Sequence, residues 1–207
     1  ASYQYESTNT LDFSGFELLV GGSANDIFAL EGAGSFAGTV NGGLGSDRIS
    51  YVNYDSGALV DLGAGTATGL GSYVSIEGAL GSAYDDTLVG TAGNDIFNVS
   101  YYGSGMVNGV FSFTAFEVLD GGLGADVLSH AGYTSAVVLD LKNNTATGID
   151  SFTSFEAFIG GSTAADEIHG KAAGSIFTID AADSGTADTL LFSAYESLLG
   201  GAANDSF

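Results

Sequence analysis

Two copies of one glycine- and aspartate-rich turn constrain most strongly how this chain can fold. Residues 42–47 read GGLGSD and residues 121–126 read GGLGAD, 79 residues further on, and an apolar strand-like segment follows each. Weaker copies occur at 21–28 (GGSANDIF) and at 200–207 (GGAANDSF). Glycines permit the left-handed backbone of tight turns, and an aspartate at the exit of a turn caps the backbone or binds a hard cation. Recurrence at a fixed spacing predicts a repeat architecture.

The internal similarity extends well beyond these turns. Residues 42–90 correspond to residues 121–170 at an offset of 79, with the same order and spacing of segments. Residues 9–28 correspond to residues 188–207 at an offset of 179, with twelve of twenty positions identical. We therefore expect residues 1–207 to form a single continuous segment of a longer repeat protein.

The local sequence texture is that of short strands. Segments such as DRISY, ALVDL and FEVLD are rich in β-branched and aromatic residues and are bounded by glycine-rich turns. No segment keeps a helical period over about 11 residues. Short strands in repeats predict an all-β fold, namely a right-handed parallel β-solenoid of the β-helix or β-roll type with no substantial helix. The alternative is an antiparallel sandwich, whose hairpins would favour Asn-Gly or Asp-Gly turn centres.

The charge and composition of the chain limit its partners and its location. The 25 acidic and 3 basic residues give a formal net charge of −22, so no basic patch is available for nucleic acid or an anionic membrane surface. A hydrophobic content of 45% argues against disorder, and the absence of cysteine excludes disulfides and zinc–thiolate sites. No apolar run reaches the roughly 20 residues of a membrane span, so membrane insertion is not expected. We expect a secreted bacterial protein, extracellular or at the cell surface.

The turns resemble the RTX (haemolysin-type) calcium-binding nonapeptide repeats, G-G-x-G-x-D-x-U-x, in which U is a large apolar residue. Residues 42–50 and 121–129 match every fixed position, and degenerate tandem copies occupy 81–98 and 161–178, where Ser175 replaces one aspartate. The resemblance implies calcium as a cofactor, held by motif carboxylates and by carbonyl groups of the turn glycines. The candidate carboxylates are those of Asp26, Asp47, Asp86, Asp95, Asp126, Asp166 and Asp205, and the candidate carbonyls are those of Gly21, Gly42, Gly43, Gly45, Gly121, Gly122 and Gly124.

A complete ion site in that family requires two turns stacked on one another in successive coils. The best candidate pair is 21–26 with 42–47, which are 21 residues apart, about one large coil. Long uninterrupted nonapeptide arrays are absent from the chain. The alternative role for these aspartates is to cap turns and to accept hydrogen bonds from neighbouring backbone amides.

A second motif, aromatic-x-x-aromatic-Glu, occurs at 13–17, 113–117, 152–156 and 192–196. We expect its copies to stack into internal aromatic ladders and polar rows rather than to form a carbohydrate-binding platform. The two histidines, His130 and His169, have no fixed acidic partner in the sequence, and we expect both at the surface. The chain has no G-x-S-x-G, H-E-x-x-H or G-x-G-x-x-G motif, so we do not expect an enzyme.

The leading hypothesis is a structural, non-catalytic extracellular repeat module of a bacterial surface adhesin, sheath or filament protein, stabilised by calcium. Open coil edges favour end-to-end stacking into a homo-oligomer or filament, and cell-surface or polysaccharide contacts are the other expected partners. Two alternatives stay open at this point. One is a calcium-dependent folding module of an RTX-like exported protein, and the other is a carbohydrate-active β-helix enzyme.

Overall fold

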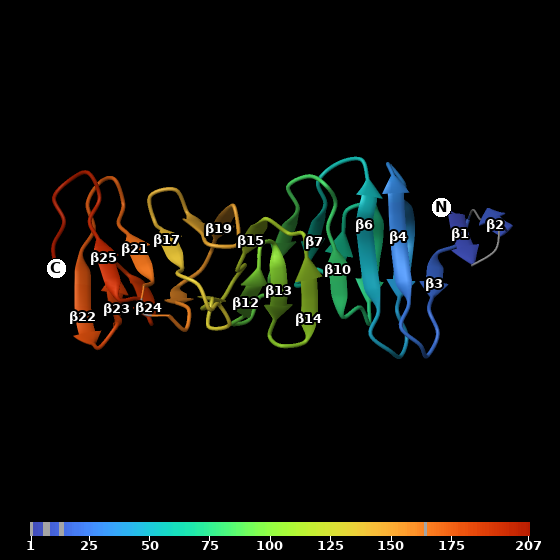
Figure 1. Cartoon of the computed structure of the whole chain (residues 1–207). Helices are drawn as coiled ribbons and strands as arrows, with labels where there is room; N and C mark the ends of the chain where they lie inside the picture. Colours follow the sequence, from blue (N-terminus) through green and yellow to red (C-terminus); the bar gives the residue numbers. More distant parts are fainter. Residues whose placement is uncertain (1, 6–8, 13–14, 164) are drawn as a thin grey trace.

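The computed structural model describes residues 2–5, 9–12, 15–163 and 165–207. Within these ranges the chain is all-β, contains no helix, and forms a parallel β-solenoid of about five turns. The coils stack in an elongated molecule whose two chain ends lie at opposite ends of the stack (Figure 1). The predicted fold class is therefore confirmed, while the handedness of the coil stays a prediction. No described segment is a helix that could span a lipid bilayer.

Two faces form the wall of the solenoid in the described ranges, an 11-stranded sheet on one side and an 8-stranded sheet followed by a 4-stranded sheet on the other. From the N-terminal end, the 11-stranded sheet contains β4 (Ile27–Gly32), β6 (Arg48–Tyr54), β10 (Gly78–Leu80), β14 (Phe111–Thr114), β13 (Ser104–Val107), β12 (Ile96–Tyr101), β16 (Val127–Ser129), β20 (Ala157–Ile159), β24 (Leu190–Ser193), β23 (Ser184–Ala187) and β22 (Phe177–Ala181). The 8-stranded sheet contains β3 (Leu18–Val20), β5 (Phe36–Asn41), β9 (Leu70–Val74), β8 (Thr66–Ala67), β7 (Leu59–Asp61), β11 (Thr87–Val89), β15 (Val118–Asp120) and β19 (Ser151–Thr153). The 4-stranded sheet contains β18 (Thr145–Ala146), β17 (Val138–Asp140), β21 (Glu167–His169) and β25 (Ser197–Leu199). A hairpin of β1 (Ser2–Tyr5) and β2 (Asn9–Asp12) forms a separate antiparallel sheet.

Parallel pairing between coils fixes the register of the wall. Strands β3 and β5 pair with Leu18 opposite Thr39, and β4 and β6 pair with Ile27 opposite Arg48. These pairings stack turn 21–26 on turn 42–47, as expected from their spacing. Later coils are longer, as the pairing of Val127 with Ala157 shows.

Antiparallel meanders interrupt this parallel wall, a feature that we did not predict. Strands β12, β13 and β14 follow one another in the sequence and pair antiparallel. In the sheet, β13 and β14 therefore lie between β12 and the earlier strand β10. Strands β22, β23 and β24 repeat this arrangement further along the same face. On the other face, β7, β8 and β9 pair in the same way. The turn between β13 and β14 is Asn108-Gly109, with φ of 54° and 69°, which is the hairpin turn signal of an antiparallel pair.

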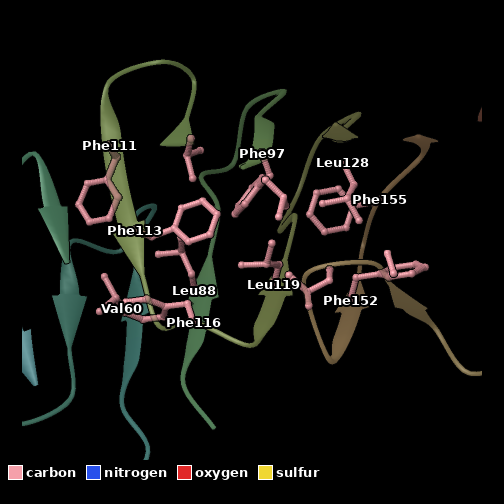
Figure 2. Close-up of a cluster of buried hydrophobic side chains, with 14 of the residues drawn as sticks. Val60, Leu88, Phe97, Phe111, Phe113, Phe116, Leu119, Leu128, Phe152 and Phe155 are labelled. Atoms are coloured by element: carbon pink, nitrogen blue, oxygen red, sulfur yellow. The ribbon is translucent and has the colours of Figure 1, made fainter. Parts of the chain in front are cut away.

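Apolar side chains from both faces fill the space between the sheets (Figure 2). Val60, Leu88 and Leu119 follow one another across β7, β11 and β15, and all three are 0% exposed. Burying each such side chain contributes about 1.5–3 kcal/mol. The ring of Phe97 lies edge-on to the ring of Phe155, with centroids 5.2 Å apart.

The aromatic-x-x-aromatic-Glu motifs contribute to this core, as predicted. Phe116, Phe155 and Tyr195 are all buried, and the ring centroids of Phe152 and Phe155 are 6.3 Å apart. The prediction of internal aromatic packing is therefore confirmed for the copies in the middle and C-terminal parts of the chain. In the N-terminal copy, Phe13 lies outside the described residues and Phe16 is 60% exposed, so the prediction of internal packing is wrong for Phe16.

Candidate metal-binding turns

Both complete glycine-rich turns lie along one edge of the solenoid, and each stacks directly on a degenerate turn. Turn 42–47 lies on turn 21–26, because the Leu44 amide donates to the Gly22 carbonyl at 3.0 Å and the Asp26 amide donates to Asp47 Oδ1 at 2.7 Å. Turn 121–126 lies on turn 90–95 in the same way, with the Asp95 amide donating to Asp126 Oδ1 at 2.7 Å. The first pair was predicted, whereas the second was not, because its two turns are spaced differently in the sequence.

The first glycine of each complete motif has no room for a side chain. A Cβ atom on Gly121 would approach the carbonyl oxygen of Ser154 and the carboxylate of Asp126 closer than 3.0 Å, and a Cβ on Gly42 would meet Ser75 and Asp47 in the same way. The crowding carbonyl belongs to the corner of the next coil, where Ser154 has φ of 56°. Close approach of two backbones therefore requires glycine at this position.

Most of the candidate carboxylates accept hydrogen bonds from backbone amides, which is the capping role. Asp86 is buried and accepts from the amides of Ala58 and Ser82, the latter at 2.6 Å. Asp166 accepts from the Val137 amide at 2.7 Å and from the Gly161 amide at 2.6 Å.

The other capped carboxylates follow the same pattern. Asp95 accepts from the amide and the hydroxyl of Thr91 at 2.6 and 2.8 Å. Asp26 accepts from the Gly22 amide at 2.8 Å, and Asp205 accepts from the Ser175 amide at 2.8 Å.

Glutamates at the corners of successive coils extend these contacts into axial ladders. Glu156 and Glu196 belong to the second motif, whereas Glu77 follows Ile76 and lies outside it. The amide of Asp126 donates to Glu156 Oε2 at 2.8 Å, and the amide of Asp47 donates to Glu77 Oε2 at 2.9 Å. On the opposite edge, the amide of Asp166 donates to Glu196 Oε2 at 2.9 Å. Each ladder thus joins three successive coils through one aspartate and one glutamate carboxylate.

Two carboxylate oxygens differ from the rest because they are buried and have no hydrogen-bond partner among the described residues. They are Oδ2 of Asp47 and Oδ2 of Asp126, which belong to the two complete GGxGxD motifs. Burial, together with the negative charges of Asp95 and Glu156, raises the pKa of Asp126 above its ordinary value, although the hydrogen bond from the Asp95 amide opposes the rise. An unpaired buried carboxylate oxygen is an acceptor for a cation or a proton.

Backbone oxygens of these two turns are also available to a hard cation. None of the carbonyl oxygens of the seven candidate glycines accepts a hydrogen bond from the residues that the structure describes. The described residues contain no cluster of three or more acidic or histidine side chains that could hold a metal by themselves. Carbonyl oxygens and one carboxylate oxygen are ligands that calcium accepts. The residues therefore fit calcium at turns 42–47 and 121–126, whereas the capped aspartates are already occupied by protein donors.

Comparison with protein families identifies the repeats. Residues 80–99, which contain the tandem nonapeptides at 81–98, match the model of the RTX calcium-binding nonapeptide repeat (4 copies). The chain carries degenerate RTX-like repeats. A search of curated proteins found no match to the chain. RTX repeats bind calcium, and RTX repeat proteins are typically exported and generally non-catalytic.

The expectation that both histidines lie at the surface is wrong for His130, which is 0% exposed. Its Nε2 lies 2.7 Å from the Thr147 carbonyl oxygen, its ring packs edge-on to Tyr133, and its Nδ1 has no partner among the described residues. In the preceding RTX-like unit Tyr51 occupies the equivalent place and donates to the Thr68 carbonyl at 2.7 Å. An aromatic donor is required there, which the sequence offset of 79 could have revealed.

The other histidine, His169, is half-buried and lies 3.1 Å from Glu167 Oε2. We expected no acidic partner for His169, and this contact corrects that expectation. A strand places residues two apart on the same face, and Glu167 and His169 are two apart on β21.

Acid is expected to destabilise the chain through His130, and His130→Tyr is expected to remove this loss. Burial lowers the pKa of His130, against the effects of its Thr147 hydrogen bond and of Asp166, so below about pH 6.5 the unfolded chain binds the proton first. Stability therefore falls as the pH drops from 7.5 to 5, by at most about 2 kcal/mol, because pH 5 lies about 1.5 units below the unfolded pKa and each unit corresponds to about 1.4 kcal/mol. Urea unfolding of both proteins at the two pH values measures this difference. Equal losses in the two proteins would contradict the prediction.

Proposed function

We propose that this chain is a structural, non-catalytic repeat module that binds calcium at two turns, 42–47 and 121–126. The observation that supports this most directly is the pair of buried, unpartnered carboxylate oxygens of Asp47 and Asp126. Leaving an anionic oxygen buried without a partner is costly, and a bound cation removes that cost. The match to RTX repeats favours calcium as that cation.

Asp47 and Asp126 supply the charged ligand of each site. The carbonyl oxygens of Ser75 and Ser154 come from the next coil and lie against the same glycines as these carboxylates, so they are the neighbouring neutral ligands. Calcium takes six to eight oxygen ligands, which leaves places for glycine carbonyls and water. Bound calcium supplies positive charge between two coils of a chain whose formal net charge is −22, and this offsets like-charge repulsion.

Calcium stabilises a fold that the protein's own donors already hold together. Asp86, Asp95 and Asp166 are satisfied by amide and hydroxyl groups, so the coils that they join do not depend on a metal. This favours a calcium-stabilised structural module over a module that folds only when calcium is present.

Thermal unfolding of the chelator-treated chain, followed by circular dichroism, tests this function. We expect the β-sheet spectrum to persist in chelator and the unfolding midpoint to rise with added calcium but much less with magnesium. At a calcium concentration 100 times the dissociation constant, each site adds about 2.7 kcal/mol. The double variant Asp47→Asn, Asp126→Asn is expected to lose this rise. Unfolding that is unchanged by calcium in the unmodified chain would contradict the proposal.

The setting that we propose is outside the cell, in a bacterial surface adhesin, sheath or filament protein. Typical export of RTX repeat proteins and the elongated stack of coils support this setting. Stacking between coils also makes a homo-oligomer or filament the natural assembly, since the outermost strands of such a stack present unpaired backbone groups. Electron microscopy of the secreted protein checks for such filaments.

The carbohydrate-active alternative finds no support in the lining of one groove on the solenoid. A groove of about 280 Å³ lies beside β9 and β13, and its lining residues include one carboxylate, Glu77, and no basic side chain. A catalytic groove of that class uses a pair of carboxylates. We therefore do not adopt this alternative.

A further inference from the structure

The two complete GGxGxD turns and the degenerate turns differ in the acceptor of one backbone amide. In four degenerate turns, the amide near the start of the turn donates to Oδ2 of the motif aspartate. The four contacts are Gly22 to Asp26 at 2.8 Å, Ser82 to Asp86 at 2.6 Å, Thr91 to Asp95 at 2.6 Å and Gly161 to Asp166 at 2.6 Å. In these four turns Oδ2 of the motif aspartate therefore already has a protein donor.

In the two complete motifs the corresponding amide points elsewhere. The Gly43 amide donates to Oδ1 of Asn41 at 3.0 Å, and the Gly122 amide donates to Oδ1 of Asp120 at 3.0 Å. Gly43 and Gly122 have φ of 99° and 92°, a conformation that favours glycine and turns the amide away from the motif aspartate. These are the turns in which Oδ2 of the aspartate has no partner.

The residue two places before the amide accounts for this difference. In the two complete motifs it is Asn41 or Asp120, whose short side chain accepts the amide in an Asx turn. In the four degenerate turns it has an apolar side chain that cannot accept a hydrogen bond. These four residues are Val20, Leu80, Val89 and Ile159.

We infer that Asn41 and Asp120 are positioning residues that hold the motif aspartates open for calcium. By accepting the Gly43 and Gly122 amides, they leave one carboxylate oxygen each of Asp47 and Asp126 for the ion. The inference rests on the proposed calcium function and adds to it the residue, outside the GGxGxD motif, that decides whether a turn can bind. The four turns preceded by Val20, Leu80, Val89 and Ile159 cap their own aspartate.

The double variant Asn41→Val, Asp120→Val tests this role without crowding the wall. Asn41 lies between Val20 and Val74 in the sheet, and Asp120 lies between Val89 and Thr153, so valine suits both positions. We expect the glycine amides to cap Asp47 and Asp126 in the variant. Without calcium, the unfolding equilibrium constant should fall about tenfold, as a buried acceptor gains its donor. With calcium, the stabilisation seen in the unmodified chain should be lost.

The conservative variant Asp120→Asn is the matched control, because asparagine already performs this role at position 41. It is tested in the double variant Asn41→Val, Asp120→Asn, in which Asn41→Val removes the calcium response of turn 42–47. We expect this double variant to keep the calcium response of turn 121–126. A double valine variant that keeps the full calcium response would overturn the inference. So would a variant that is less stable than the unmodified chain in chelator, since that result assigns the two residues a purely structural role.

A gain of function provides the reverse test. Val20→Asn places an acceptor before Gly22, which can adopt positive φ, whereas Val89→Asn places one before Thr91, a β-branched residue that resists this conformation. With isothermal titration calorimetry, we expect one additional calcium site in Val20→Asn and none in Val89→Asn. If the unmodified chain binds no calcium, the proposed function fails. The stability of the double valine variant in chelator still tests whether Asn41 and Asp120 keep the glycine amides from capping Asp47 and Asp126.

Discussion

Replacing Gly121 by alanine is expected to destabilise the chain by about 3 kcal/mol, among the largest effects of any single methyl group in this structure. The added Cβ atom would lie too close to the carbonyl oxygen of Ser154 and to the Asp126 carboxylate. Neither group can move easily, because Ser154 is held in a corner between coils and Asp126 Oδ1 is bonded to the Asp95 amide. Urea unfolding followed by circular dichroism measures the loss.

Gly132→Ala is the control for this substitution. No atom lies within 4 Å of the position that its Cβ would occupy, and its backbone has no unusual φ. We expect a change within about 0.5 kcal/mol, as for an ordinary surface substitution. Equal stability of the two variants would contradict the close stacking of turn 121–126 on the next coil.

Asp86→Ala is expected to cost about 3 kcal/mol or more and to cost the same with and without calcium. The substitution removes a buried carboxylate that accepts from the amides of Ala58 and Ser82 and from the Ser82 hydroxyl. Buried donors left without an acceptor cost about 1–3 kcal/mol each. Chemical unfolding in chelator and in calcium provides both values.

The neighbouring substitution Asp85→Ala provides the comparison, because Asp85 is exposed and carries the same charge. It is expected to change stability by no more than about 0.5 kcal/mol. If Asp86→Ala lost its stability only in the presence of calcium, Asp86 would be a metal ligand, and the division between capped and open aspartates would be wrong.

The sequence was sufficient to predict the solenoid and one of its stacked turn pairs. Strand length, turn composition and the offset of 79 all reflect local geometry that each coil repeats, so they are visible without the structure. The 21-residue spacing of turns 21–26 and 42–47 likewise predicted their contact, which the bond from the Asp26 amide to Asp47 confirms.

The antiparallel meanders, and the difference between capped aspartates and those with an open oxygen, could not be predicted from the sequence. Asn108-Gly109 is a hairpin signal, but the second meander has Asp188-Thr189 between β23 and β24, so the signal does not recur with the structure. The capping of Asp86 depends on the Ala58 amide, 28 residues away, and therefore on the register between coils. His130 was misplaced for a similar reason, because its burial follows from its partner Thr147 and from the corresponding Tyr51–Thr68 pair.

The antiparallel meanders also bear on how such a chain reaches its folded state. A parallel coil forms only after about 30 residues of chain have closed a loop, as the Val127–Ala157 pairing illustrates, and closing that loop has an entropic cost. A meander pairs residues that are close in sequence, so it forms quickly and without a neighbouring coil. The segments 96–114 and 177–193 are therefore expected to act as folding nuclei on which later coils assemble. A long array of these units would carry its nuclei at regular intervals and could refold from many points after being stretched.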